Sequence, residues 1–568
     1  MSSPVQPPLW NSAQVPAGAR EGRWHGFSGW LSWALLVLLC GFFFGQAPPD
    51  VNESHYLTKA KHFWNPQWCS GDLFLRSAEA HWLFFFATGW LTKFVSLETY
   101  AWLGRLLSWL LVATAWLQLS RQVSQRAWFA LFSFALFLLF NLRFHLAGEW
   151  VVGGFEGKPL AYACGIWAVA AWLRGNWPQT VFLIGAAIGW HALVGGWLGL
   201  AVALATLSLG SQGIREAIAG CWPSRGSLLS GIQIAAGACL ALTGVLPSLL
   251  SQSAASPEQL REVAWIQVTQ RLSHHLWFTA FPTGRVAAFA LLAAFCCLMA
   301  MRVLWPRALG LMFRLAFAGL LFNLIGLCLS AMVSEQSAGA NVACSLLRLY
   351  WFRFADFAIP LAVALGTGWL LESWSRQGNP RLQIVIARGV LVVLSLAAGL
   401  QALENWETSR PGADAAALEQ FPSEPNKELK LAANWRQVCQ WIAAETPPQA
   451  VFITPARQQS FKWYAERAEV VCWKDMPQDP AGIVEWSRRL NLVYRPQLDY
   501  ELGLFAFDDL QLQQLGAELG ADYLLLPQAE YDQVRDRCRL PLIYPSDPQA
   551  RVSFVVLRLP STGGKSPD

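Results

Sequence analysis

The sequence predicts a polytopic α-helical membrane protein with about eleven spans, followed by a C-terminal soluble α/β domain. Of the 568 residues, 54% are hydrophobic and only 14% are charged, against roughly 25% charged in an ordinary soluble domain. The charges are also unevenly divided, because residues 1–404 contain 25 Lys and Arg and 15 Asp and Glu, whereas residues 405–568 contain 17 and 22. A basic, hydrophobic part therefore precedes an acidic part that has the composition of a soluble domain.

Apolar runs define the predicted spans. Residues 1–29 are polar and contain Pro, and we expect them to form a disordered cytoplasmic N-terminus. The run 178–208 is too long for one crossing, since a helix rises about 1.5 Å per residue, so we predict two short spans with a break near Gly195 and Gly196. The other predicted spans are 30–47, which resembles an uncleaved signal anchor, and 99–119, 128–144, 159–173, 228–250, 285–304, 311–332, 357–373 and 384–403.

The short loops predict the orientation. With the N-terminus inside, every short inside loop contains Arg, as the positive-inside rule requires. These residues are Arg121, Arg126, Arg174, Arg215, Arg225, Arg302, Arg307, Arg376 and Arg381. The outside then receives a large first loop, 48–98, whose apolar run 82–95 does not cross, and the acidic C-terminal part. We expect an integral protein of the bacterial inner (plasma) membrane with an extracytoplasmic C-terminal domain.

The C-terminal part reads as a linker, 405–428, and an α/β domain, 429–568. Predicted helices cover 431–445, 461–467, 481–491 and 508–520, and predicted strands cover 449–455, 468–473, 521–527 and 551–559. This mixture is typical of a small layered domain. The chain contains no GxGxxG and no GxxxxGK[ST] motif, so nothing favours a nucleotide site, and we expect no nucleic-acid partner.

The twelve cysteines are scattered and form no CxxC pair, which predicts neither a zinc site nor a disulfide framework. One disulfide among Cys439, Cys472 and Cys538 stays open.

Two carboxylates, Asp50 and Glu53, follow the first span and lead into a stretch that we expect to be helical from about Asn52. One interpretation is local: Asp50 caps the helix and Glu53 is a first-turn charge, which the helix dipole favours. The other interpretation is an acid pair that performs chemistry at the outer face of the membrane.

The second outer loop, LAGEWVVGGFEGKPLAYA, adds Glu149, Glu156 and Lys158 between glycines. Glycines let the backbone approach a ligand closely, and a Lys beside a Glu suits a phosphate or a metal-bridged pyrophosphate. Snorkelling interfacial charges are the alternative. His191, in GWHALVGG, faces the same outer surface, either as an intramembrane functional residue or as a hydrogen-bonded structural one.

Two further outer loops contain basic residues. The 251–284 loop has Arg271 with His274 and His275, which we interpret as an interfacial helix that binds a lipid phosphate rather than as a metal site, because adjacent helical residues point apart and no third ligand is evident. Arg348 and Arg353 lie at the outer mouth of a span, and Arg is a natural partner for a lipid phosphate. An Arg353–Asp356 pair at i,i+3 is the alternative.

The arrangement resembles the GT-C glycosyltransferases, which are multi-span enzymes that use lipid-phosphate sugars at the outer membrane face. The resemblance rests on the first-loop motif D-x-x-E-x-x-Y-L-x-x-A, on later elements of the H-x-L-F…G…GR type, on EGKPLAYA and GWHALVG, on the C-terminal pattern TP…F..YAER…VVCWKDMP…EWSRRL, and on a C-terminal soluble domain. The later elements are His81, Leu83, Phe84, Gly89, Gly104 and Arg105. The resemblance to the GT-C glycosyltransferases covers most of the chain, although its motifs are short.

This resemblance implies transfer of a sugar from a polyprenyl-phosphate donor to a glycan, lipid or protein acceptor, with Asp50 and Glu53 as the catalytic acids. From the residues of the outer loops themselves, we take Lys158, Arg348, Arg353, His191 and Arg271 as candidate contacts of the donor and its phosphate, and Glu149, Glu156, His274 and His275 as candidate contacts of the acceptor or a metal. A divalent cation, Mg or Mn, is left open, and membrane lipids are expected partners. The DVNE spacing departs from the usual adjacent Asp-Glu or Asp-x-Asp, which puts in doubt which of Asp50 and Glu53 is catalytic.

Two other functions stay open. A transporter or lipid-linked glycan flippase would need acids inside the spans and inverted repeats. The predicted spans have almost no such acids, and no repeat is evident. A non-catalytic membrane scaffold is the third interpretation.

Overall fold

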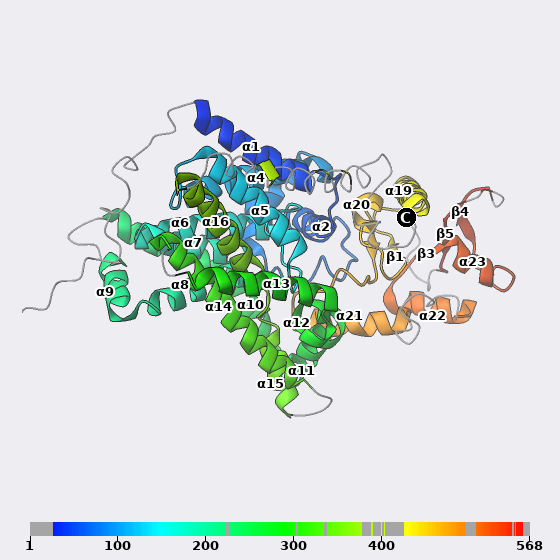
Figure 1. The fold of residues 1–568 in the computed structure, drawn as a ribbon. Helices are drawn as coiled ribbons and strands as arrows, with labels where there is room; N and C mark the ends of the chain where they lie inside the picture. The colour runs from blue at the N-terminus through cyan, green and yellow to red at the C-terminus, as the bar shows by residue number, and fades with distance from the viewer. Residues whose placement is uncertain are drawn as a thin grey trace, which may run out of the picture.

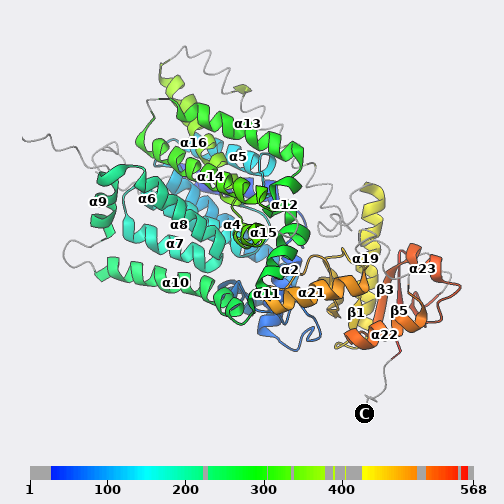
Figure 2. The same cartoon turned by 90° about the horizontal axis from the view of Figure 1, so that it is seen from below.

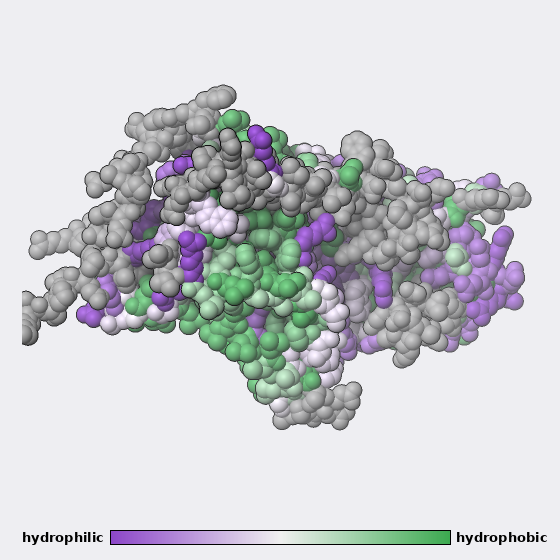
Figure 3. Space-filling view, viewed as in Figure 1, coloured by the Kyte–Doolittle hydropathy of each residue, from purple (hydrophilic) through white to green (hydrophobic). Residues whose placement is uncertain are grey.

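The computed structural model describes residues 27–221, 228–302, 305–333, 338–377, 425–494, 507–547 and 552–560, together with a few isolated residues. A helical part and a smaller α/β part lie end to end (Figures 1 and 2). The α/β part is the C-terminal one. Apolar residues dominate the visible surface of the helical part, whereas hydrophilic residues gather over the α/β part (Figure 3).

Helices occupy every predicted span that the structure describes. They are α1 (Phe27–Phe44), α4 (Leu97–Ser120), α5 (Ala127–Arg143), α6 (Gly157–Leu173), α7 (Trp177–Trp190), α8 (Ala192–Leu207), α10 (Leu228–Ser253), α13 (Thr283–Ala300), α14 (Arg307–Ala331) and α16 (Arg353–Gln377). Five of the described helices, α4, α10, α13, α14 and α16, are long and apolar enough to cross a membrane, while α1, α5 and α8 are apolar but shorter. Membrane integration is therefore supported, whereas the number of eleven spans stays a prediction. The predicted span 384–403 lies outside the continuously described residues.

Some predicted boundaries were wrong. The 178–208 run breaks at His191, four residues before the predicted position, because Nδ1 of His191 accepts a hydrogen bond from Val194 N (3.4 Å) and caps α8. Gly195 lies inside α8, where a Cβ would come within 2.2 Å of Ile188 N in α7, so this glycine serves close helix packing instead of a turn. Two further shifts are small, since α1 begins inside the predicted N-terminal segment and α19 (Pro425–Glu445) begins inside the predicted linker.

The segments that the sequence predicts as outer loops, whose names are kept below, contain short helices. The first loop forms α2 (Glu53–Trp64), α3 (Trp82–Thr88) and the 3-10 helix η2 (Gly89–Lys93), so the 82–95 run is a pair of short helices. The later loops form α11 (Pro257–Trp265), the π-helical η3 (Ile266–Arg271), α12 (Ser273–Leu276), η4 (Phe278–Ala280) and α15 (Ala338–Leu347). The helix α9 (Gly210–Cys221), which joins α8 to the segment before α10, was not predicted.

The C-terminal part is a five-stranded sheet between helices, as the sequence predicts. The strand order is β2-β1-β3-β5-β4, in which β1 pairs in parallel with β2 and β3, and β5 pairs antiparallel with β3 and β4. The elements are β1 (Val451–Ile453), α20 (Phe461–Ala465), β2 (Ala468–Glu469), α21 (Pro480–Val493), α22 (Asp509–Leu519), β3 (Tyr523–Pro527), α23 (Gln528–Val534), β4 (Leu542–Tyr544) and β5 (Phe554–Arg558). The prediction lacked α23 and β4, and the strand predicted at 468–473 has only two residues.

The two parts share apolar cores. Val263 and Ile266, from the α11–η3 segment, are buried in the same cluster as Ile483 and Trp486 of α21. Trp463 of α20 packs into the first-loop cluster with Leu57 and other residues of the loop. The C-terminal part is therefore anchored on two outer loops by burial of apolar surface.

Candidate functional site

The first-loop acids have different surroundings. Glu53 is fully buried, and both of its carboxylate oxygens accept hydrogen bonds from the guanidinium of Arg105 at 2.6 Å. The backbone N–H groups of Asp50 (2.8 Å) and Phe155 (2.7 Å) also donate to Glu53. This bidentate, charge-assisted geometry is among the strongest that a carboxylate makes. Glu53 therefore holds the first loop, α4 and the second outer loop together.

Asp50 is only half-buried. Its Oδ1 accepts from Val51 N and its Oδ2 from Gly154 N, both at 2.8 Å. A carboxylate oxygen has two lone-pair directions, so each Asp50 oxygen keeps capacity for one more donor. Asp50 is thus the less enclosed of the two acids, and it is held by backbone groups at a position next to the second outer loop.

Two glycines allow this close packing. A Cβ at Gly154 would lie 2.9 Å from Oδ2 of Asp50 and from Cγ of Glu53. A Cβ at Gly104, beside Arg105, would lie within 2.4 Å of three ring carbons of Phe155. Neither position tolerates a side chain without displacement of its neighbours.

The second outer loop is fixed by α16 and α5. Asp356, which is fully buried, accepts hydrogen bonds from the backbone N–H groups of Leu146 (2.6 Å), Ala147 (2.9 Å) and Glu149 (3.2 Å). Asn141 of α5 donates to Glu149 O at 3.1 Å. Asp356 therefore serves the loop backbone, which differs from the predicted alternative of an i,i+3 pair with Arg353.

A small cavity, partly open to solvent, lies beside this loop. Its polar lining consists of Glu149, Tyr162, His191, Tyr350 and Arg353. Its apolar lining consists of Leu193, Val194, Trp197 and Phe354. Three residues that the sequence singled out separately, Glu149, His191 and Arg353, therefore meet at one cavity.

Charges alternate in and beside the cavity. Arg353 Nε lies 3.3 Å from Glu149 Oε2, and Tyr162 donates to Glu149 Oε1 at 2.9 Å. Lys158 Nζ lies 3.6 Å from Glu149 Oε2 and 3.5 Å from Glu156 Oε1. Asn52 Nδ2 donates to Glu156 Oε2 at 3.4 Å, which joins this group to the segment of Asp50. Burial raises the pKa of Glu156 above its ordinary value although Lys158 opposes the shift.

A divalent cation would find suitable donor types here but not a suitable arrangement. Oε2 of Glu149 and Oε1 of Glu156 are buried without a hydrogen-bond donor, and carboxylate oxygens are ligands that Mg²⁺ prefers. The ammonium of Lys158, however, lies between these two oxygens and compensates both. The described residues thus do not fit a metal at this position.

Tyr56 and His81 were not predicted as site residues, although both stand in the motifs of the family resemblance. The Tyr56 hydroxyl lies 3.4 Å from Nε2 of His81, and the His81 and His191 rings are 5.0 Å apart. Burial lowers the pKa of His81 to about 4 and raises that of Tyr56 well above its ordinary value, where Glu156 adds to the effect. At neutral pH the phenol is therefore a donor and His81 is uncharged.

The other predicted residues lie away from the cavity lining. Arg271 donates from Nε to Trp473 O (2.8 Å) and from Nη2 to Lys474 O (3.3 Å), so its guanidinium contacts the C-terminal part. His275 donates to Ala147 O at 2.6 Å, and burial lowers the pKa of His274 to about 4. Arg348 is half-buried in the segment after α15.

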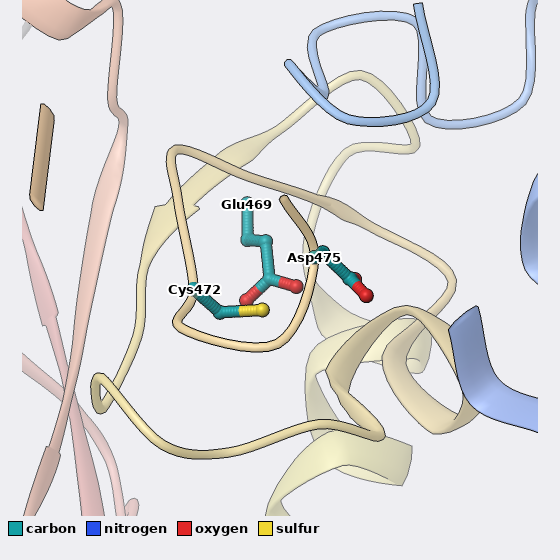
Figure 4. Close-up of side chains that lie close together, drawn as sticks. All are labelled: Glu469, Cys472 and Asp475. Atoms are coloured by element: carbon teal, nitrogen blue, oxygen red, sulfur yellow. The ribbon is translucent and has the colours of Figure 1, made fainter. Parts of the chain in front are cut away.

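A second group of buried charges lies where the first loop meets the C-terminal part, and no sequence pattern predicted it. Lys462 Nζ lies 2.5 Å from Glu469, 2.6 Å from Asp475 and 3.3 Å from Asp72. The ligand atoms of Glu469, Cys472 and Asp475 lie within 4.8 Å of one another. Figure 4 shows the Glu469 carboxylate beside the Cys472 thiol, whereas the Asp475 carboxylate is directed away from that thiol. Because the Lys462 ammonium contacts both of these carboxylates, it already supplies the positive charge that a metal ion would bring.

Comparisons with known proteins give few matches. A family model described as a domain of unknown function, DUF6798, matches residues 433–493, which run from α19 to the end of α21. A search of curated proteins gave no match. Among solved structures, the archaeal oligosaccharyltransferase AglB from Archaeoglobus fulgidus, in complex with an inhibitory peptide and a dolichol-phosphate, is 11% identical. The match covers 94% of this chain and 76% of that chain with a TM-score of 0.41. A likeness of this size carries no argument about fold or function.

Proposed function

We propose that this protein is a membrane glycosyltransferase of the GT-C type, which transfers a sugar from a polyprenyl-phosphate donor to an acceptor at the extracytoplasmic face. The observation that carries the proposal is the cavity beside the second outer loop, where Glu149 and Arg353 lie next to Lys158 and Glu156. Carboxylates and cations together, at the ends of apolar helices, suit both halves of such a transfer.

The first half is activation of the acceptor. A hydroxyl that attacks an anomeric carbon must lose its proton, and a carboxylate within hydrogen-bond reach takes it. We assign this role to Asp50, because it is half-buried and has lone pairs to spare. Glu53 is committed to Arg105, so we assign it to positioning Asp50. Glu156 is the second candidate base, since its raised pKa brings proton uptake closer to neutral pH.

The second half is departure of the lipid phosphate. The leaving group gains negative charge as the glycosidic bond breaks, and preorganised cations stabilise that charge. Arg353 offers a planar guanidinium suited to phosphate oxygens, and Lys158 adds an ammonium close to the same carboxylate. The product would then form with inversion in a single displacement, without a covalent enzyme intermediate.

The proposal is tested with the purified full chain in lipid nanodiscs and a panel of polyprenyl-phosphate monosaccharides. Release of polyprenyl phosphate, with sugar recovered on a hydroxyl acceptor, is the expected result. Asp50→Asn should abolish release, while Glu98→Gln, a change of an exposed carboxylate in the first turn of α4, should not. If Asp50→Asn is fully active, its assigned role is wrong.

The same preparation separates the proposal from the flippase alternative. A flippase would move a fluorescent polyprenyl-phosphate sugar across proteoliposomes without release of polyprenyl phosphate. Translocation without release in the wild type would therefore overturn the transferase assignment.

A further inference from the structure

We infer that the C-terminal domain belongs to the site of the proposed reaction, because its Asp475 holds His55 and thereby positions α2, the helix that carries Tyr56 toward the cavity. Asp475 and Lys462 are, in this inference, positioning residues. The inference rests on the proposed function for its kinetic consequence, but its structural consequence can be measured independently.

The contact crosses between the two parts of the chain. Nδ1 of His55, the third residue of α2, donates to Oδ1 of Asp475 at 2.7 Å, while Oδ2 of Asp475 lies 2.6 Å from Lys462 Nζ. The His55 side chain is 12% exposed and the Asp475 side chain 2% exposed. A hydrogen bond to a buried carboxylate loses little to competition with water, so its geometry constrains both partners.

The neighbours of His55 restrict its ring further. The ring stacks on Phe74 with centroids 4.1 Å apart and meets the Tyr56 ring edge-on at 5.0 Å. Tyr56 in turn reaches His81. A shift of His55 therefore moves the residue next to it. Tyr56 is linked to the cavity through His81, whose ring lies 5.0 Å from that of the lining residue His191.

Lys462 fixes the position of Asp475. Its ammonium also contacts Asp72 of the first loop and Glu469 of β2, and all four side chains are at most 2% exposed. Glu469 Oε2 accepts from Thr454 (2.8 Å) and from Gln458. The carboxylate that holds His55 is thus part of a closed, buried network, which leaves it little freedom to follow α2 if α2 moves.

The segment 473–479 also contacts a second stretch of the first loop and the 251–284 loop. Its Asp479 and Gln478 side chains accept from the backbone N–H groups of Ala78 (3.1 Å) and Ala80 (3.0 Å), just before His81. Its backbone accepts from Arg271, as described above. Figure 1 shows α2 and α20 next to each other where these parts meet. One segment of the C-terminal domain therefore orders the flanks of His55 and of His81 together.

The test compares three variants of the full chain in nanodiscs. Asp475→Asn keeps the shape of the side chain but removes its charge. His55→Phe keeps the stack on Phe74 but removes the donor, and it leaves Asp475 paired with Lys462. The matched control is Glu466→Gln, which breaks the cross-domain pair with Lys61 (2.8 Å), a contact whose carboxylate is 51% exposed.

The first measurement needs no substrate. Hydrogen–deuterium exchange of the peptide that covers residues 53–64 should become at least tenfold faster in Asp475→Asn and His55→Phe, and should stay unchanged in Glu466→Gln. If Asp475→Asn and His55→Phe both exchange at the wild-type rate, the inference is wrong, whatever reaction the protein catalyses. If Asp475→Asn does not fold, His55→Phe alone decides the outcome.

The second measurement is the kinetic split. In Asp475→Asn and His55→Phe we expect kcat for polyprenyl-phosphate release to fall about tenfold, with KM for the donor nearly unchanged. A further variant, Asp475→Glu, which keeps the charge, should have a higher kcat than Asp475→Asn. A change confined to KM, or unaltered kcat with faster exchange of α2, would contradict the positioning role. If the wild type itself releases no polyprenyl phosphate, the proposed function is wrong. The exchange measurement then still tests whether the His55–Asp475 contact positions α2.

Discussion

Removal of the Arg105 side chain isolates the energetic role of the buried acid Glu53. Both side chains are completely buried, and two hydrogen bonds of 2.6 Å join them. In Arg105→Met the carboxylate would keep its two backbone donors, Asp50 N and Phe155 N, but would lose its counter-ion. Loss of one partner from a buried ion pair typically costs about 3–5 kcal/mol, because the remaining charge is left uncompensated in a low dielectric.

The double variant Arg105→Met/Glu53→Gln separates this charge effect from loss of packing. It removes both charges, and replacement of a buried pair by hydrophobic residues of similar volume often costs little. The Gln amide oxygen can accept from only one of the two backbone donors, so a smaller cost remains. We therefore expect the single variant to melt well below the wild type and the double variant to recover most of that loss. Thermal unfolding of the detergent-solubilised full chain, followed by the fluorescence of its 31 Trp residues, measures both.

The control is Arg488→Met. Arg488 also pairs with acids, Glu485 and Glu518, both at 2.7 Å, but all three side chains are at least 32% exposed, so its removal should cost about 1 kcal/mol or less. Equal melting temperatures for Arg105→Met and the double variant would refute the reasoning, since the loss would then arise from packing of the guanidinium and not from the stranded charge.

Four further predictions concern other parts of the chain. Gly154→Ala should lower polyprenyl-phosphate release at least tenfold while the protein still folds, because the new Cβ would displace Asp50 and Glu53; unchanged release would contradict the tight fit. Burial raises the pKa of Glu469 from 4.5 to about 7, so the folded state binds more protons than the unfolded state between these values, and this group's contribution to stability falls as pH rises through that window. Between pH 5 and pH 8 the melting temperature of the wild type should therefore change with pH in part through Glu469, and the Glu469→Gln variant should lack that part of the change. Release should persist in EDTA, because Lys158 lies between the carboxylates that would hold a metal; a loss that Mg²⁺ or Mn²⁺ restores would reverse that conclusion. A reporter fused to the C-terminus should be accessible to a protease added to spheroplasts if the positive-inside orientation is correct, and protected if it is not.

Local patterns predicted the elements well and their contacts poorly. Apolar runs located the helices of the described predicted spans, α1, α4 to α8, α10, α13, α14 and α16, because the requirement for about 20 apolar residues is a property of each segment alone. The break at His191 was misplaced because Gly195 and Gly196 resemble a turn signal, whereas their lack of a side chain serves, at Gly195, close packing against α7. Glycine supports both uses, and only the neighbouring helix decides between them.

Long-range charge pairs escaped prediction for a different reason. Arg105 meets Glu53 across 52 positions, and Lys462 meets Asp72 across 390 of the 568 positions. Periodicity carries no information about such distances. The scarcity of charge in the helical part singled out Glu149 and Lys158 in one loop and Arg353 in another, since charges in apolar surroundings must find partners, but it did not reveal that Arg353 and Lys158 both lie next to Glu149.

The short helix α2 contacts both groups of buried charges, through Glu53 with Arg105 and through His55 with Asp475. Residues three or four apart lie on one side of a helix. Glu53 and Tyr56 form such a pair, and they face Arg105 and the groups of the cavity. His55 and Lys59 form another, and they face Phe74, with Lys59 donating to the carbonyls of Phe74 and Ser77 at 2.8 Å.

A twelve-residue helix with little apolar surface is buried in this way because each of these polar groups finds its partner in a different segment of the chain. A rotation of α2 about its axis that improved one set of contacts would break the other. The orientation of Tyr56 is thus determined jointly by the helical part and by the C-terminal domain, which is why a change as distant in sequence as Asp475→Asn should affect the cavity.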